Sequence, residues 1–246
     1  MRNTLGYRAT IGILVPARNT TVQPESEDMR PLGVTNHVAR LGFKGMSRAP
    51  LSSDFKVNQY SQDYHSAIDL VRLAEPDLIL LGYSHDSFIG GVRGGEALQA
   101  KLTAYAGRPV VVPSLAYRAA VRALDLKRVA ILTPYVSDDD PLVRAFFEEL
   151  GCVVVRIRAL EFKTAHDIAQ MPEAVIRDGL TAVDGRDVDA ILQVGTNLPT
   201  ARIAAEAEFW LRKPVLACNT VDYWHALRTA GVNDRSPAFG TLFSSH

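Results

Sequence analysis

The chain has 246 residues, of which 47% are hydrophobic and 22% charged, and its 27 basic side chains balance its 27 acidic ones. This composition is typical of a folded globular protein and argues against disorder. The zero net charge argues against nonspecific nucleic-acid binding and against a polybasic membrane anchor. No apolar run reaches the ~18 residues of a membrane-spanning helix, and no signal-peptide pattern opens the sequence. With two cysteines and no Cys-x-x-Cys motif, we expect a soluble cytoplasmic protein without structural disulfides.

Short runs rich in Ile, Leu and Val alternate along the chain with segments of helical periodicity. The runs, which predict strands, are 10–15, 77–82, 109–112, 128–133, 152–157, 189–194 and 214–217. The segments that predict helices are 58–74, 94–105, 115–124, 141–150, 200–211 and 221–230. Because the runs are nearly continuous, they indicate strands covered on both faces, as in parallel α/β sheets. Pro141 behind three aspartates is typical of a helix start.

Three pieces of the chain recur in the same order further along. The matched pairs are 11–16 (IGILVP) with 129–134 (VAILTP), 77–84 with 189–196, and 108–121 with 213–226. Buried strands resemble one another by composition alone, but the shared order and shared prolines favour two copies of one unit. We therefore predict an α/β protein with two pseudo-symmetric Rossmann-like halves, each with a parallel sheet. The first half is expected to span 1–115 plus 219–246, and the second 116–218.

Ligands bind beyond the carboxyl ends of parallel strands, so the active site is expected in the cleft between the halves. The residues that follow the predicted strands are then the site candidates. From the first half these are PARN (16–19), YSHDS (83–87) and the Pro-Ser pair at 113–114. From the second half they are the Pro-Tyr pair at 134–135, GTN at 195–197 and the Cys-Asn pair at 218–219.

These segments resemble the aspartate/glutamate racemase superfamily, in the branch of maleate cis-trans isomerases and arylmalonate decarboxylases. The motifs that carry the resemblance are VPARNTTVQPE (15–25), LGYSHDSF (81–88), LTPYVSDD (132–139), VGTNLPT (194–200) and CNTVDYWHALR (218–228). The resemblance implies two α/β halves with the site between them, chemistry without a cofactor, and a homo-oligomer, a dimer or tetramer. The superfamily's racemases place one catalytic cysteine after a central strand of each half. Those positions fall on Tyr83 and Gly195, so both thiols are absent here.

The resemblance also implies which residues bind substrate. Asn19 corresponds to a carboxylate ligand and Tyr135 to a substrate-binding hydroxyl, while Ser84 and Thr196 correspond to hydroxyls of the two oxyanion loops. The remaining substrate-binding residues that we predict are Ser87, Gly195 and Asn197. Gly195 would let backbone amides approach a ligand. The alternatives are an ordinary helix cap for Asn19 and a packed rim aromatic for Tyr135.

Ionisable side chains stand where the family has small residues in the first half. An imidazole titrates near neutral pH, so we predict that His85 acts as general acid or base, with Tyr83 or Asp86 as partner. Alternatively, His85 only bonds the loop, Tyr83 fills the space of the lost thiol, and Asp86 orients His85. No metal and no cofactor are predicted, since the aspartates at 138–140 suit a helix N-terminus. Cys218 is expected to be buried and inert, with a relocated thiol as the alternative.

The sequence therefore predicts a cofactor-independent lyase or isomerase of a small, dicarboxylate-like catabolic intermediate. The reaction would pass through an enolate or oxyanion, which each positioned donor stabilises by ~3–4 kcal/mol. One alternative is a hydrolase of a small cyclic or amide substrate that uses water activated by His85. Another is a non-catalytic protein that binds a small acid. No nucleic-acid or membrane partner is expected.

Overall fold

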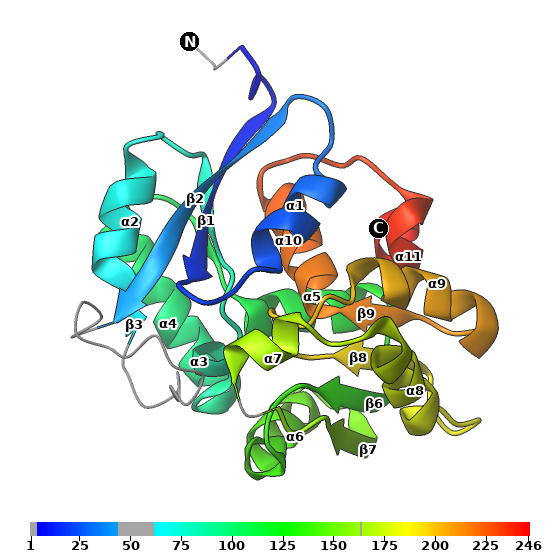
Figure 1. Cartoon of the computed structure of the whole chain (residues 1–246). Coiled ribbons are helices and arrows are strands. Elements are labelled where there is room, and N and C mark those ends of the chain that lie inside the picture. Colours follow the sequence, from blue (N-terminus) through cyan, green and yellow to red (C-terminus); the bar gives the residue numbers. More distant parts are fainter. Residues whose placement is uncertain (1–3, 44–61, 163) are drawn as a thin grey trace.

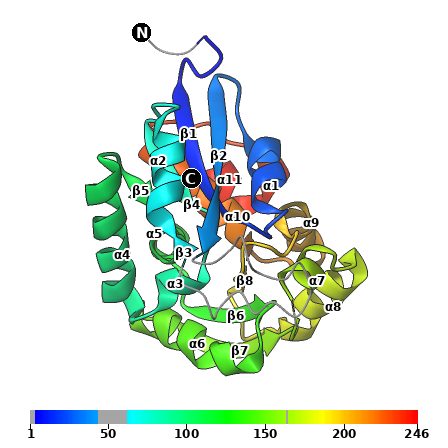
Figure 2. The same cartoon turned by 60° about the vertical axis from the view of Figure 1, so that its left-hand side comes forward.

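The structure is a computed structural model that describes residues 4–43, 62–162 and 164–246. Within these residues the strands form two sheets (Figures 1 and 2). The first sheet has the order β3-β2-β1-β4-β5, and its strands are β1 (Ala9–Pro16), β2 (Val34–Phe43), β3 (Gln62–Asp63), β4 (Leu78–Leu81) and β5 (Val110–Val111). The second has the order β7-β6-β8-β9, and its strands are β6 (Arg128–Thr133), β7 (Val153–Ala159), β8 (Ala190–Gln193) and β9 (Val215–Ala217). Neighbouring strands run parallel, except that β3 is antiparallel to β2.

The two sheets repeat one topology. The order β2-β1-β4-β5 returns as β7-β6-β8-β9, so β1, β4 and β5 correspond to β6, β8 and β9. These are the strands that the three repeated sequence pieces predict. The α/β fold with two related halves and parallel sheets is therefore confirmed, with β3 as an antiparallel addition. The division of the chain after residues 115 and 218 stays a prediction.

Helices connect the strands and cover the sheets (Figure 1). Those of the first sheet region are α1 (Val22–Met29), α2 (Tyr64–Arg72), α3 (His85–Phe88), α4 (Gly91–Ala106) and α5 (Pro113–Ala123). Those that follow are α6 (Asp140–Glu149), α7 (Ala165–Ala169), α8 (Glu173–Val183), α9 (Ala201–Leu211), α10 (Cys218–Thr229) and α11 (Gly240–Ser245). Of the helices that the structure describes, none is both long and apolar enough to cross a membrane.

Several elements differ from the sequence prediction. The helix expected over 58–74 starts only at Tyr64, because residues 62–63 form β3, and 58–61 lie outside the described residues. The last predicted helix starts at Cys218 rather than at residue 221, so Cys218 opens α10 and does not end a strand. The sequence also misses β2. Polar residues interrupt its apolar ones, which β2 tolerates because its outer neighbour β3 pairs only with its last two residues.

The largest hydrophobic cluster joins the two halves. It contains Ile13 of β1, Ile131 of β6 and the aromatic rings of Phe88 and Phe146, which meet edge to face with centroids 4.9 Å apart. Full burial of one such side chain stabilises the fold by roughly 1.5–3 kcal/mol. Separate clusters cover the outer face of each sheet, under α2 and α4 in the first half and under α8 and α9 in the second. The shared cluster holds the carboxyl ends of the strands of both halves in a fixed relation.

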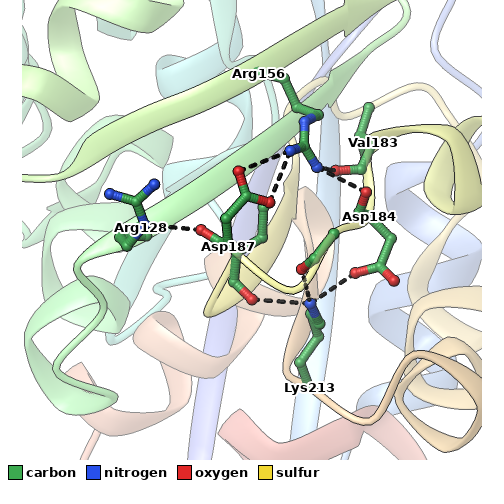
Figure 3. A network of polar contacts seen from close by, with 8 residues as sticks. Arg128, Arg156, Val183, Asp184, Asp187 and Lys213 are labelled. Carbon is green, nitrogen blue, oxygen red and sulfur yellow. Dashed lines mark hydrogen bonds and ion pairs between the residues drawn. The ribbon is translucent and has the colours of Figure 1, made fainter.

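A polar network fixes the amino-terminal side of the second sheet (Figure 3). The ammonium group of Lys213 donates to the carbonyls of Gly185 and Val188, at 2.6 and 2.8 Å, and pairs with Asp184 at 2.7 Å. Arg156 binds both carboxylate oxygens of Asp187, at 2.7 and 2.9 Å. These contacts fasten the turn before β8 at the end of the strand opposite to the predicted site.

Candidate functional site

The segments that follow β1, β4, β6 and β8 meet at the junction of the two halves. Thr196, after β8, donates its hydroxyl to the carbonyl of Gly82, after β4, at 3.1 Å. The side-chain amide of Asn19, after β1, donates to the Thr196 hydroxyl at 3.2 Å. Both contacts cross from one half to the other. The structure thus brings Asn19 and Thr196 together, as the position of both residues after parallel strands predicts.

Asn19 is buried, and hydrogen bonds fix the orientation of its side-chain amide. Its side-chain oxygen accepts the backbone N–H groups of Thr21 and Val22, at 2.9 and 3.0 Å, at the start of α1. The helix-capping role is therefore realised. The same bonds turn the NH2 group toward Thr196, where one N–H remains for an anion. The two interpretations of Asn19 are compatible in one geometry.

Asn197 joins the same two loops. Its side-chain oxygen accepts the backbone N–H of Thr20 at 3.1 Å, and its backbone carbonyl accepts the Thr21 hydroxyl at 2.8 Å. Its side-chain NH2 group donates to the carbonyl of Ala165. All these bonds hold protein groups together. Asn197 therefore positions the loop after β1 against the loop after β8.

Ser84 and Tyr135 form a hydroxyl pair across the junction, with their oxygen atoms 2.6 Å apart. Ser84 is buried and Tyr135 is partly buried. Burial raises the pKa of Tyr135 well above its ordinary value, with the nearby Cys218 adding to the effect. Tyr135 thus keeps its proton at neutral pH. The pair can donate hydrogen bonds to an oxyanion, but it cannot supply a base.

His85 is the first residue of α3 and lies between two carboxylates. Its Nδ1 atom is 3.5 Å from Asp86, and its Nε2 atom is 3.6 Å from Asp139 of the second half. The hydrogen bond with Asp86 raises the pKa of His85 above its ordinary value, burial opposes this, and Asp139 adds to it. The surroundings therefore stabilise the imidazolium form relative to that of an ordinary histidine. This makes His85 a cationic proton donor beside the Ser84–Tyr135 pair.

Asp86 is held by side chains from its surroundings. Tyr64, on α2, donates its hydroxyl to one carboxylate oxygen at 2.5 Å. Burial alone would raise the pKa of Asp86, but hydrogen bonds from His85, Tyr64 and Tyr83 outweigh it and lower the pKa. An ionised, anchored carboxylate of this kind orients an imidazole rather than exchanging protons itself. The contacts thus favour the orienting role for Asp86, with the Tyr83 hydroxyl as one of its hydrogen-bond donors.

Two of the predicted substrate-binding residues, Ser87 and Gly195, have structural roles. The hydroxyl of Ser87 donates to the Ser84 carbonyl at 2.6 Å and accepts the Ser114 N–H at 3.1 Å, and Ser87 is fully buried. It supports Ser84 from behind. Gly195 has φ of +128°, and a Cβ built there would lie 2.6 Å from Pro134. Glycine is required by the backbone at this position, not merely tolerated in place of a cysteine.

Cys218 has no exposed surface, and its thiol contacts the backbone of Gly195. Its sulfur is 3.7 Å from a carboxylate oxygen of Asp222, one helical turn further along α10. Burial raises the pKa of the Cys218 thiol and that of the Asp222 carboxyl, so both groups keep their protons. This arrangement agrees with the interpretation of Cys218 as a buried and inert residue.

Sequence reasoning missed several residues of the site. Asp139 was assigned only to a helix start and Tyr64 to no role, because each reaches the site from a segment distant in the sequence. Glu25 lies in a quoted motif without a role, and Asn219 counts among the site candidates only by its place after a predicted strand. A glutamate in the first turn of a helix was the available signal for Glu25. Among the described residues, no three His, Cys, Asp or Glu side chains lie close enough together to hold a metal ion.

Comparison with known proteins agrees with this architecture. A family model described as arylmalonate decarboxylase matches residues 11–243. The arylmalonate decarboxylase of Bordetella bronchiseptica is 30% identical to this chain, over 64% of the chain and 67% of that protein. A maleate isomerase of Pseudomonas putida is 27% identical, over 95% of this chain and 96% of that protein. A mutant of the Nocardia farcinica maleate cis-trans isomerase, solved with a covalently bound succinylcysteine intermediate, has a TM-score of 0.82 at 23% identity and covers 97% of this chain and 99% of that one.

The structure is that of a two-half α/β protein whose polar side chains converge at the junction of the halves. Since the family model spans nearly the whole chain, the chain belongs to the arylmalonate decarboxylase family. The resemblance to the branch of maleate isomerases and arylmalonate decarboxylases, stated on the motifs, is thereby confirmed.

Proposed function

We propose that this protein is a cofactor-independent enzyme that decarboxylates or isomerises a small carboxylate without a catalytic thiol. The observation that carries the proposal is the position of His85. Its imidazole lies between Asp86 and Asp139, beside hydroxyl donors contributed by both halves. The homologous decarboxylase and isomerases support the reaction class.

The proposed roles follow from the donors at the junction. The amide of Asn19 and the hydroxyl of Thr196 would bind a substrate carboxylate. Ser84 and Tyr135 would stabilise the negative charge on oxygen as an enolate forms. Donors fixed in advance cost no reorganisation when the charge develops, and each contributes ~3–4 kcal/mol to the transition state.

His85 would supply the proton. In a decarboxylation, the bond to the departing carboxylate breaks, CO2 leaves, and the electron pair remains as an enolate. The carbon then takes a proton from the His85 imidazolium, so one N–H bond breaks and one C–H bond forms. Neutral His85 regains a proton from water. In an isomerisation, a C–H bond next to the substrate carboxylate would first break and its proton would pass to neutral His85, and the imidazolium so formed would return a proton to carbon of the resulting enolate.

The protonation state of His85 argues against the hydrolase alternative. A base that activates water must be neutral, whereas the two flanking carboxylates favour the imidazolium form. Hydrolysis therefore needs a pH above the raised pKa of His85. The same upward shift of the pKa favours a proton donor.

Proton NMR in deuterated buffer tests the proposal. The protein is incubated with malonates, maleate, cyclic imides and lactones, and the spectra report decarboxylation, isomerisation, ring opening and deuterium incorporation. We expect decarboxylation or isomerisation with deuterium at the reacting carbon, and a loss of about 10²-fold or more in His85→Gln. His65→Gln is the matched control, because His65 is exposed and stacks on Tyr105, with centroids 4.0 Å apart.

The contrary outcomes are distinct. Turnover that survives in His85→Gln would contradict the role of His85, and ring opening would identify a hydrolase. Line broadening of an acid without turnover would indicate a binding protein. The dimer or tetramer, the cytoplasmic location and the catabolic substrate stay predictions of the sequence. Light scattering of the purified protein tests the first of these.

A further inference from the structure

Glu25 makes hydrogen bonds at the junction of the two halves, and the proposed chemistry gives it no role. It lies in the first turn of α1 and directs its carboxylate toward α9 and α10. One oxygen accepts the backbone N–H of Ala201, the first residue of α9, at 2.8 Å. The other accepts the side-chain NH2 of Asn219, on α10, at 2.6 Å. One carboxylate thus joins three helices at the junction of the halves.

The contact with Asn219 leads directly into the site. The same NH2 group of Asn219 donates to the backbone carbonyl of Thr196 at 2.9 Å. The Thr196 hydroxyl in turn bonds Asn19 and Gly82. Because the two N–H bonds of Asn219 are used by Glu25 and Thr196, the carboxylate fixes the orientation of the amide. The amide then fixes the main chain of Thr196.

We propose that Glu25 is a positioning residue whose ionised carboxylate, through Asn219, holds the loop 195–197 in the conformation that binds the substrate carboxylate. The inference rests on the proposed function for its consequence on binding. Its structural part, the hold of Glu25 on the loop, stands on the contacts alone. Loss of the negative charge is then expected to release the loop and weaken anion binding.

The Glu25 carboxyl changes its charge near neutral pH. Burial raises the pKa of Glu25 to about 7, against the lowering effect of the bonds from Ala201, Asn219 and Thr200. A protonated carboxyl carries an O–H where an acceptor is needed, so it opposes one of the N–H donors that now face it. Hydrogen bonds to an ionised group are about twice as strong as neutral ones. Protonation therefore weakens the link to Asn219 and α9.

The charged groups near Glu25 do not neutralise it. Asp28, one turn further along α1, adds a repulsive effect that raises the pKa of Glu25 slightly. Arg202, on α9, binds both oxygens of Asp28 at 2.6 Å and so is engaged. On α10, the carboxyl of Asp222 contacts Cys218. In the described part of the chain, the ion pairs found do not include Glu25.

Backbone amide NMR of the ligand-free protein is the test. In the wild type, the amide shifts of Gly195, Thr196 and Asn197 should move together with a midpoint near pH 7. In Glu25→Gln the shifts should be flat across this range. Asp28→Asn is the matched control, because it breaks an exposed ion pair between the same two helices and does not touch Asn219. It should keep the titration, as should His85→Gln, which removes the other group that titrates nearby.

Binding of malonate, measured by calorimetry, tests the consequence. We expect wild-type affinity to fall as the pH drops from 8 to 6, and Glu25→Gln to bind about tenfold more weakly at pH 8 with no acid limb. Amide shifts that titrate equally in Glu25→Gln would overturn the proposal. A titrating loop with malonate binding independent of pH would keep the hold on the loop and overturn its link to binding. No malonate binding in any protein, with the loop still titrating, would count against the proposed function only.

Discussion

His85 of the first half and Asp139 of the second half face each other, with Nε2 of the imidazole 3.6 Å from the carboxylate oxygen. The contact crosses the junction at which the predicted substrate-binding side chains gather. The other imidazole nitrogen, Nδ1, faces Asp86, so each ring nitrogen lies near one carboxylate. The charge of a potential proton donor is therefore set by one residue from each half.

Asp139→Asn should lower the pKa of His85, because it removes one of the two carboxylates that stabilise the imidazolium. The proton-donor form is then lost at a lower pH, and the alkaline limb of activity or anion binding moves the same way. The measurement is an NMR titration of the imidazole carbon-bound protons. Asp138→Asn is the control, since Asp138 is exposed and in the same turn. An unchanged titration in Asp139→Asn would mean that Asp86 alone sets the charge.

The central strands follow from the sequence because burial on both faces demands continuous apolar runs. β6 occupies the predicted residues 128–133, and β1 extends the predicted run by one residue at each end. The repeat also predicts the shared strand order of the two sheets. β2 escapes this reasoning, because a strand with polar residues such as Asn36 and His37 has no such run.

The site was predicted where a residue directly follows a strand. As this rule predicts, Asn19 bonds Thr196 and Ser84 bonds Tyr135 across the junction of the halves. Partners that come from helix interiors or distant turns follow no such rule. Tyr64 contacts Asp86 only because the folded chain brings the first residue of α2 close to the start of α3, and no local pattern in the sequence indicates the pair.

A side chain at residue 195, the position that the motifs align with a cysteine of the superfamily's racemases, should destabilise the fold. Gly195→Ala forces an L residue to φ of +128° and brings its Cβ within 2.6 Å of Pro134. The strained backbone alone costs roughly 1–3 kcal/mol, and the contact adds to this. Gly107→Ala is the control, because Gly107 has φ of +62° with open space around it. Urea unfolding measures both.

We expect Gly195→Ala to lose clearly more stability than Gly107→Ala. Gly195→Cys should behave like Gly195→Ala and should gain no thiol-dependent activity. Equal losses in the two alanine variants would show that Pro134 yields at little cost. Thiol-dependent turnover in Gly195→Cys would show that the backbone can return to a family-like conformation.

Lys213→Met should destabilise the second half. The Lys213 side chain is 13% exposed, and its ammonium group binds two carbonyls and the Asp184 carboxylate, so its loss leaves partly buried acceptors without a donor (Figure 3). An unpaired buried acceptor costs roughly 1–3 kcal/mol. Lys127→Met is the control, because its pair with Asp125 is exposed and such pairs contribute at most about 1 kcal/mol. Thermal unfolding of both variants at one pH decides the matter, and equal melting temperatures would contradict the expectation.

Glu25 should contribute to the free energy of unfolding in a way that is greater at low pH than at high pH. Its pKa is about 7 in the folded state and roughly 4.3 in an unfolded chain. Between these values the folded state binds more protons, so the free energy of unfolding decreases as the pH rises. The contribution is complete below about pH 4.3 and is lost above about pH 7, by at most roughly 4 kcal/mol.

Urea unfolding at pH 5, 6, 7 and 8 measures this slope. Glu25→Gln should lack the component, so its stability relative to the wild type should rise with pH even though its loop 195–197 is less well held. Asp28→Asn should keep the wild-type slope. A purely structural role for Glu25 would instead make Glu25→Gln less stable by a constant amount at every pH. At high pH, Glu25→Gln should gain stability relative to the wild type while it binds malonate more weakly. This combination would separate the free-energy cost of burying the Glu25 charge from the effect of that charge on the site.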